Sequence, residues 1–383
     1  MNLSRARGVL LALAWLPALA SAAAPGLLCP HADEAIDAAA AKTMQQGSPG
    51  MLVGIYRRGQ PDYVRGYGLA NLEHRVPMRP QAVFNLASVT KQFTAAAVLL
   101  MVQDGKLRLD DRLDRYVPTL PQASRVTIRQ LLLQTSGLPD YAEDPAEATS
   151  GAVARTPDEM VQWIAGLQPS LAFEPGSAWR YSNSNYVLLG KVVEQVSGEP
   201  LQAVFARRLF APAGMTDTAF DDPTQVVPGR TQGYRRDKQA PGGFANARWL
   251  SPTVPGAAGG LRTTLADLAR WTQALHGGRI LHEELLRTMT SPGHLDDGRT
   301  TKLGMPQAWQ EGLDADYGMG VFINASPFGH RIWHSGDMPG FSTWLAYYPL
   351  TGVTIALAIN SESADLPRDE IERLAFACVG VRE

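Results

Sequence analysis

Residues 341–360 read FSTWLAYYPLTGVTIALAIN, and two runs in this stretch are apolar or alternate between apolar and polar residues. Each run is bounded by Gly, Pro or Asn, residues that commonly end strands. Because aromatic and β-branched residues favour strands, the stretch predicts one strand over 341–348 and another over 353–360. Two more strands with the same features are predicted before them, over 317–324 and 329–334.

A second pair of strands is predicted near the start of the chain. Residues 51–56 and 63–67 are short apolar runs separated by Arg58-Gly59-Gln60-Pro61, which is a hairpin signal. Between the two strand-rich ends, roughly residues 107–255 contain helix-length segments and Pro/Gly turns. The economical assembly is one antiparallel sheet built from both ends of the chain, with the helical middle inserted as a second domain.

Helices are expected at both ends and beside the sheet. The Ala-rich residues 32–46 predict a helix that ends at Gly47, and residues 368–379 predict a closing helix. Residues 88–104 are apolar on nearly every side, which is typical of a buried helix. Further helices are expected over residues 126–134, 157–165, 186–196, 201–210 and 265–275. We therefore expect an α/β sandwich domain from residues 25–95 and 262–383 and an inserted, mostly helical domain from residues 96–261.

Composition argues against several classes of partner. The chain has 383 residues, 45% of them hydrophobic, which is enough to bury at least one large core. Lys and Arg number 35 against 37 Asp and Glu, a net charge of −2. Since binding to nucleic acid or to an anionic membrane surface usually needs a basic excess, we expect neither partner. Two cysteines are too few for a disulfide scaffold or a Cys-based metal cage.

The first residues have the features of a secretory signal. Arg5 and Arg7 give a positive start, residues 9–20 are an apolar run too short to span a bilayer, and the small residues at 20–24 suit cleavage. We expect residues 1–24 to be a signal peptide and the mature protein to be periplasmic or secreted. No later stretch reaches spanning length, so no integral membrane span is expected after cleavage.

The two cysteines raise the hypothesis of one disulfide bond. A bridge between Cys29 and Cys378 would close a loop of about 350 residues and constrain both ends of the chain. Two buried thiols are the alternative.

Several common chemistries have no support in the sequence. The seven histidines form no His-Glu-x-x-His or other ligand-spaced cluster, so no metal site is expected. The sequence contains no Gly-x-x-x-x-Gly-Lys phosphate loop and no Gly-x-Gly-x-x-Gly motif after a strand, and no serine lies in a Gly-x-Ser-x-Gly elbow. We therefore expect no cofactor.

Ser88-Val89-Thr90-Lys91 begins the apolar helix and is the first motif with chemical potential. Positions three apart share a helix face, so the Ser88 hydroxyl and the Lys91 amine can touch. Free N–H groups at the helix start stabilise a developing anion. Burial would lower the pKa of Lys91 and provide a neutral amine that activates the serine. An N-cap followed by a surface lysine is the ordinary alternative.

Tyr181-Ser182-Asn183 is the second motif and precedes a predicted helix. A tyrosine near a lysine ammonium can have a lowered pKa and act as a general base. The Asn183 amide can donate to a substrate carbonyl. A turn followed by a helix N-cap is the ordinary interpretation.

His334-Ser335-Gly336 is the third motif and is expected at the end of a strand, before Asp337. A glycine there lets a substrate lie against the strand edge, and the imidazole and hydroxyl can hold a carboxylate. An ordinary strand-to-turn transition is the alternative.

These three motifs in this order resemble the serine β-lactamase and penicillin-binding superfamily. The chain looks most like the branch that holds class C β-lactamases, DD-carboxypeptidases, D-amino-acid-specific peptidases and β-lactamase-like esterases, and the resemblance covers nearly all of the mature chain. Similar segments are Phe84-Asn85-Leu86-Ala87, QTSGLPDY at residues 134–141, Phe173-Glu174-Pro175-Gly176 and Gly259-Gly260-Leu261. The resemblance implies an antiparallel sheet flanked by terminal helices, an αβα sandwich, with an inserted helical domain.

The resemblance also implies roles for individual residues. Ser88 would be the acylated nucleophile, and Lys91 and Tyr181 would activate it, with the choice of general base left open. Asn183 would orient the substrate amide. The backbone N–H groups of Ser88 and Asp337 would form the oxyanion hole.

The third motif departs from the pattern of the β-lactamases. His334, with Ser335 and Gly336, occupies the place of a Lys-Thr/Ser-Gly triplet, and a histidine is only partly cationic at pH 7. This departure resembles the DD-peptidase and D-peptidase side of the branch. Asp337 either favours a substrate with a free amine or caps a turn.

Three functions remain open at this point. The first is a DD-carboxypeptidase or D-amino-acid peptidase that forms an acyl-enzyme on Ser88. The second is an esterase or class C-type β-lactamase on the same machinery. A non-catalytic penicillin-binding-like protein is the third, but a binding protein does not need an activated nucleophile. The expected partner is a small-molecule or peptide substrate, either a D-amino-acid peptide, an ester or a β-lactam.

Overall fold

The computed structural model describes residues 32–44, 47–57, 62–302, 314–362 and 366–377. The expected signal peptide (residues 1–24), Cys29 and Cys378 lie outside the described residues. The disulfide bond and the cleavage therefore stay predictions.

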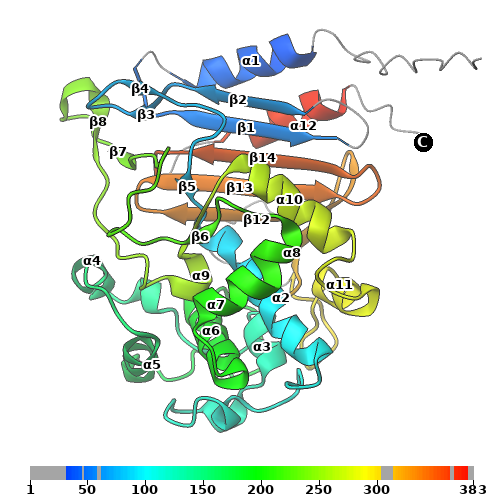
Figure 1. Cartoon of the computed structure of the whole chain (residues 1–383). Coiled ribbons are helices and arrows are strands. Elements are labelled where there is room, and N and C mark those ends of the chain that lie inside the picture. The colour runs from blue at the N-terminus through cyan, green and yellow to red at the C-terminus, as the bar shows by residue number, and fades with distance from the viewer. Residues whose placement is uncertain (1–31, 45–46, 58–61, 303–313, 363–365, 378–383) are drawn as a thin grey trace, which may run out of the picture.

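One seven-stranded antiparallel sheet forms the centre of the molecule (Figure 1). Its strands, in spatial order, are β10 (Asp316–Tyr317), β11 (Phe322–Ser326), β12 (Gly329–Met338), β13 (Phe341–Tyr348), β14 (Val353–Ile359), β1 (Met51–Tyr56) and β2 (Tyr63–Tyr67). The first strand of the chain pairs with the last, from Met51 opposite Ile359 to Tyr56 opposite Thr354. This confirms the prediction of one antiparallel sheet built from both ends of the chain.

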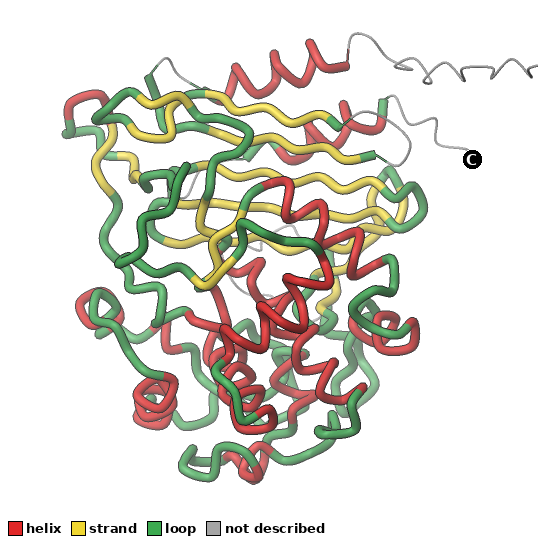
Figure 2. The backbone as a smooth tube through the Cα atoms, in the orientation of Figure 1, coloured by secondary structure: helices red, strands yellow, loops and turns green. Residues whose placement is uncertain are grey.

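Helices lie on both faces of the sheet and below it (Figure 2). They are α1 (Ala32–Thr43), α2 (Thr90–Gln103), α3 (Ile128–Leu132), α4 (Glu147–Ser150), α5 (Pro157–Gly166), α6 (Asn183–Ser197), α7 (Leu201–Phe205), α8 (Ala211–Ala213), α9 (Gly256–Gly259), α10 (Leu265–His276), α11 (Glu283–Met289) and α12 (Arg368–Phe376). The middle of the chain supplies α3 to α9, as the helical segments predicted. The exact domain limits at residues 96 and 261 remain predictions.

Alternation along β1 explains the two layers. Side chains of a strand point alternately to opposite faces, so Val53 and Leu52 enter different cores. Val53 packs in the apolar cluster that contains Ile36 of α1 and Ile371 of α12. Leu52 packs in the larger cluster that contains Leu268 of α10 and the buried face of α2. The terminal helices therefore cover one face of the sheet, and α10 with the helical middle covers the other.

Two element boundaries differ from the sequence predictions near the motifs. The helix predicted over residues 88–104 is a 3-10 turn over Ala87–Val89 followed by α2. Ala87 has a φ of +48°, a left-handed conformation that breaks the helix geometry. The strand predicted over 329–334 continues to Met338, because its last residues pair with the start of β13. The polar triplet that suggests a turn is thus held in the ladder.

Other predicted elements differ in their limits or are divided in two. The stretch expected as one strand over 317–324 forms β10 and β11, separated by a turn. The helix predicted over 186–196 begins earlier, at Asn183, and the segment over 201–210 is α7 followed by a single wider turn over Ala206–Phe210.

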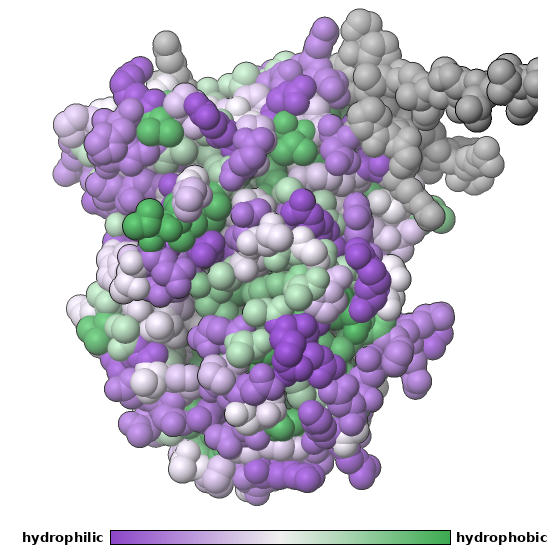
Figure 3. All heavy atoms as spheres, viewed as in Figure 1, coloured by the Kyte–Doolittle hydropathy of each residue, from purple (hydrophilic) through white to green (hydrophobic). Residues whose placement is uncertain are grey.

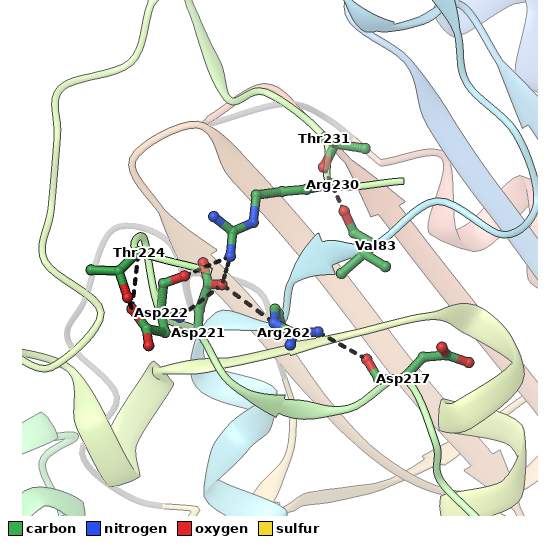
Figure 4. A network of polar contacts seen from close by, with 8 residues as sticks. All are labelled: Val83, Asp217, Asp221, Asp222, Thr224, Arg230, Thr231 and Arg262. Carbon is green, nitrogen blue, oxygen red and sulfur yellow. Dashed lines mark hydrogen bonds and ion pairs between the residues drawn. The ribbon is translucent and has the colours of Figure 1, made fainter. Parts of the chain in front are cut away.

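A small sheet joins the helical middle to the segment that carries the first motif. It has the order β5 (Phe84–Asn85), β9 (Leu261–Thr263) and β6 (Ala219–Phe220). Asp221 accepts a hydrogen bond from Arg230 at 2.7 Å and lies 3.5 Å from Arg262 of β9, while Arg262 also donates to the Asp217 carbonyl (Figure 4). This polar network holds β6 and β9 together beside β5. The turn that carries the first motif begins at Ala87, shortly after the end of β5. Two short pairs, β3 (Leu69–Asn71) with β4 (Val76–Pro77) and β7 (Tyr234–Arg236) with β8 (Phe244–Asn246), form separate two-stranded sheets.

Hydrophilic residues cover most of the face drawn in Figure 3, with paler and more apolar residues across its middle. Among the described residues, five large apolar side chains are exposed: Val76, Val153, Val226, Trp249 and Leu350. Within the same residues, no helix combines the length and the apolar character needed to cross a bilayer.

Candidate active site

The turn that carries Ser88 is held by two hydrogen bonds at the peptide unit that joins Leu86 to the strained Ala87. The Asn85 side chain accepts a hydrogen bond from the Ala87 N–H at 3.0 Å. Thr343 of β13 donates its hydroxyl to the Leu86 carbonyl at 3.0 Å. A left-handed alanine costs of the order of 1 kcal/mol, so the surrounding contacts must impose this conformation. Ser88 is half-buried at the head of α2.

Gly336 of β12 lies directly against this turn. A Cβ atom at position 336 would come within 2.6 Å of the Leu86 carbonyl oxygen and 2.9 Å of the Ala87 side chain. The sequence suggested that this glycine makes room for substrate. In the structure it makes room for the backbone before Ser88, which brings the third motif next to the first.

Lys91 has no exposed surface, and its amine has three polar partners. The Nζ atom lies 3.1 Å from the Ser88 Oγ, 2.7 Å from the Asn183 Oδ1 and 2.8 Å from the Ala258 carbonyl oxygen. Burial lowers the pKa of Lys91 from 10.5 to about 7, and the charge of Asp140 opposes this shift. The desolvated lysine expected from the apolar helix is therefore present.

The loop that carries Tyr181 is clamped by one buried residue. The Gln134 carbonyl accepts from the Arg180 N–H, and the Gln134 side-chain Oε1 accepts from the Ser182 N–H, both at 3.1 Å. Gln134 has a φ of +62°, which lets its backbone and side chain reach both neighbours of Tyr181. The tyrosine is thus fixed over the amine, with the Lys91 Nζ 4.8 Å from its ring centre.

Tyr181 keeps its phenolic proton at neutral pH. Burial raises the pKa of Tyr181 well above 10, the nearby Tyr317 adds to the shift, and a hydrogen bond with the Ser88 side chain acts in the opposite direction. The sequence interpretation allowed a tyrosine with a lowered pKa. In the structure burial raises the pKa instead, so the phenol is a hydrogen-bonding group rather than a base at neutral pH.

Asn183 joins the amine to a buried carboxylate. It is the first residue of α6, and its Oδ1 faces Lys91 while its Nδ2 donates to the Asp140 Oδ2 at 2.9 Å. Asp140 and Gln134 both belong to the segment QTSGLPDY. The sequence interpretation gave neither of them a role, because no local pattern shows which polar residues of a loop turn inward.

His334 lies in the site but differs from its expected charge state. Its ring centre is 6.2 Å from that of Tyr181, and its side chain is buried. Burial lowers the pKa of His334 to about 3, and the charge of Lys91 acts in the same direction. The Nδ1 atom lies within hydrogen-bond distance of the Ser335 carbonyl, and Nε2 lies 3.4 Å from the Tyr317 hydroxyl. The expectation of a partly cationic histidine is therefore not met.

The rest of the third motif lies inside β12 rather than at its end. Ser335 is opposite Trp344, and Asp337 is opposite Ser342, which donates its hydroxyl to the Asp337 Oδ1 at 2.6 Å. The Asp337 side chain thus stabilises the hairpin across two strands and does not cap a turn. The proposed oxyanion-hole role of its backbone N–H stays a prediction.

The structure therefore brings Ser88, Tyr181, Asn183 and His334 together near the amine of Lys91. Among the described residues, no three His, Cys, Asp or Glu side chains form a group that could hold a metal ion. The arrangement suits acyl transfer, in which a serine is activated by a neutral amine beside it.

Comparison with known sequences places the chain in a family. The sequence profile described as Beta-lactamase matches residues 33–377, so the chain belongs to the beta-lactamase family. A penicillin-binding protein of Bacillus subtilis (strain 168) is 31% identical over 317 residues, covering 78% of this chain and 65% of that protein. Protein flp of Staphylococcus aureus (strain COL) is 26% identical over 87% of this chain and 64% of its own length. The chain thus spans just under two thirds of the length of these curated relatives.

The chain also resembles solved structures over most of its length. The D-amino acid amidase from Ochrobactrum anthropi SV3 complexed with D-phenylalanine is 25% identical, with a TM-score of 0.77 over 92% of this chain and 99% of that chain. The D-stereospecific amidohydrolase from Streptomyces sp. is also 25% identical, with a TM-score of 0.73 over 90% of this chain and 97% of that chain. Family and fold together place the chain in the serine β-lactamase and penicillin-binding superfamily.

The packing of Gly336 generates a prediction. Gly336→Ala should push the Leu86-Ala87 backbone and displace Ser88, lowering the rate of Ser88 labelling by a fluorophosphonate at least tenfold, since overpacking moves the backbone. Gly166→Ala is the control, because a Cβ there meets nothing within 4 Å. Equal labelling rates in both variants would contradict the role given to Gly336.

Proposed function

We propose that the protein hydrolyses amide bonds of D-amino-acid substrates through an acyl-enzyme on Ser88. The partner geometry of Lys91 carries this proposal. A neutral amine has two N–H groups and one lone pair, and two of the three Nζ partners are carbonyl oxygens that can only accept. Once Asn183 and Ala258 take the two N–H groups, the lone pair is left for the Ser88 hydroxyl proton.

The reaction then follows from the positions of the groups. Ser88 Oγ attacks the scissile carbonyl carbon while its proton passes to Lys91 Nζ. As the tetrahedral intermediate collapses, the C–N bond breaks and the leaving amine takes this proton, through the Tyr181 hydroxyl. Water then attacks the ester carbonyl and gives a proton to Lys91 Nζ. As the second tetrahedral intermediate collapses, the bond from the acyl carbon to Ser88 Oγ breaks, Oγ takes this proton back and the acid leaves.

Lys91 is the general base in this scheme, and Tyr181 is a neutral relay. Burial brings the pKa of Lys91 down to about 7. The pKa of Tyr181 is raised by burial, so a phenolate is not populated at neutral pH. Asn183 keeps its proposed role of orienting the substrate amide, and the N–H groups of Ser88 and Asp337 keep theirs in the oxyanion hole.

The neutral His334 bears on the substrate. A lysine at this place would offer a cation to a carboxylate next to the scissile bond, whereas a neutral imidazole bonded within the protein offers none. This favours a D-amino-acid amide, or a neutral ester, over the C-terminal carboxylate of a DD-dipeptide and over a β-lactam. The two D-specific amidohydrolases among the structural neighbours support the same choice. We keep the proposal that residues 1–24 are a signal peptide and that the enzyme acts in the periplasm or outside the cell.

The nucleophile can be tested directly. A fluorophosphonate should label Ser88 in the wild-type protein, and Ser88→Ala should abolish the labelling, while Ser124→Ala, at an exposed serine, should not change it. Lys91→Ala and Tyr181→Phe should each slow labelling at least about 100-fold. Labelling that survives in Ser88→Ala would reject the assignment.

The substrate class needs a panel of compounds. We expect kcat/KM for a D-phenylalanine amide to exceed that for its L-enantiomer, for an acyl-D-alanyl-D-alanine and for a chromogenic cephalosporin by about tenfold or more. Faster turnover of the dipeptide would point to a DD-carboxypeptidase, and faster turnover of the cephalosporin to a β-lactamase. A nitrophenyl ester measures hydrolysis without an amide, and turnover of none of these compounds would point to a binding protein.

The pH dependence follows from the pKa of Lys91. Below about pH 7 the amine holds a proton and cannot accept that of Ser88, so kcat/KM should fall tenfold per pH unit on the acid side and level off above pH 7. The pKa of His334 is lowered to about 3, so His334→Asn should leave the midpoint of this limb in place. A limb that disappears in His334→Asn would assign the titration to the histidine instead.

A further inference from the structure

Asp140 is a buried carboxylate that lies beside the reacting groups and has no place in the scheme above. Its two oxygens serve different partners. The Oδ1 atom accepts from the Ala142 N–H at 3.0 Å, which caps the 3-10 turn over Tyr141–Glu143. The Oδ2 atom accepts from the Asn183 Nδ2 at 2.9 Å. The cap explains one oxygen and leaves the other, which points at the site.

We propose that Asp140 is a positioning residue that holds the Asn183 amide and provides the counter-charge for the Lys91 ammonium. The inference rests on the proposed function, in which Lys91 accepts the Ser88 proton. The contacts form a continuous chain from Ser88 through Lys91 and Asn183 to Asp140, with links of 3.1, 2.7 and 2.9 Å.

The first part of the role is geometric. An ionised carboxylate can only accept hydrogen bonds, so Asp140 selects the orientation of Asn183 that directs Nδ2 toward it. The opposite end, Oδ1, must then face the amine of Lys91. A flipped amide would present N–H groups to the N–H groups of Lys91 and a carbonyl to the carboxylate. Asp140 therefore keeps an acceptor on Lys91, which is the condition for leaving its lone pair to Ser88.

The second part of the role is electrostatic. When Lys91 takes the Ser88 proton it becomes a cation with no exposed surface, which is costly without an opposite charge nearby. The Tyr181 and Tyr186 rings lie 4.8 and 5.6 Å from Nζ. His334 of β12 lies close enough for the charge of Lys91 to act on it, and burial keeps its imidazole neutral. Among the described residues, Asp140 is the carboxylate whose charge raises the pKa of Lys91 against burial.

The surroundings of Asp140 agree with this pairing. The pKa of Asp140 is raised, chiefly by burial, and the hydrogen bonds from Ala142 and Asn183 and the charge of Lys91 oppose this shift. The other carboxylate that acts on it, Glu143, is an exposed partner of Arg180. The negative charge that acts on Lys91 therefore comes from Asp140, a residue inside the site.

Two neutral variants separate the positioning role from the cap. Asp140→Asn keeps an oxygen for the Ala142 N–H but turns an NH₂ group toward the NH₂ group of Asn183. Asp140→Ser keeps a capping hydroxyl and removes the contact with Asn183. Asp144→Ser is the matched control, because Asp144 accepts from the Ala146 N–H and from the Trp163 side chain in the same loop without a contact to Lys91.

The readout is the pKa of Lys91 itself, measured on the full chain by the pH dependence of its ¹³Cε NMR signal. The chain has six lysines, so the signal can be assigned with Lys91→Arg. We expect the Lys91 pKa to fall by about half a pH unit or more in Asp140→Asn and Asp140→Ser and to stay unchanged in Asp144→Ser. An unchanged pKa in whichever neutral variant folds would overturn the proposal.

Activity is measured in parallel, so that failure of the inference and failure of the proposed function can be told apart. The acid limb of kcat/KM should move to lower pH with the Lys91 pKa, and the plateau rate should fall by up to about threefold for each half unit of that shift, because the amine becomes a weaker base. If the NMR pKa moves and the limb does not, the general-base role of Lys91 is wrong while the counter-charge role of Asp140 stands.

Discussion

A lysine amine with no access to water is the constraint on which the rest of the site depends. Burial makes a neutral amine available near pH 7, but a buried amine must also find partners for its N–H groups. The Ala258 carbonyl and the Asn183 side chain are those partners, and they come from α9 and the start of α6. The helical middle of the chain is therefore part of the chemistry, because without it Lys91 would be either solvated or unpaired.

The sheet contributes to the same site through close packing. Gly336 admits the backbone of Leu86 and Ala87 against β12, and Thr343 of β13 ties that backbone down. The left-handed Ala87 then aims Ser88 at Lys91 rather than continuing the helix. The left-handed conformation of Ala87 is thus maintained by a tertiary contact that position 336 permits only as a glycine.

Much of this was predictable from the sequence, and the reason differs between features. The sheet strands follow from apolar alternation, and the pair Ser88 and Lys91 follows from their spacing on one helix, since both are local signals. The prediction that β12 ends at His334 was wrong. Ser335-Gly336-Asp337 favours a turn locally, but these residues pair with β13 and so extend the strand. The role of Asp140 could not be predicted, because it meets Asn183 across 43 positions of the chain. His334 is uncharged because it is buried, and the burial of this side chain could not be deduced from a single sequence.

The pairing of β1 with β14 has a consequence for folding. Met51 and Ile359 lie far apart in the chain, so this part of the sheet has a high contact order and closes late. The segment that carries Ser88 follows β1, whereas the β12 surface on which it rests belongs to the strands that pair with β14 through β13. The proposed nucleophile is therefore held in place only when both ends of the chain have come together.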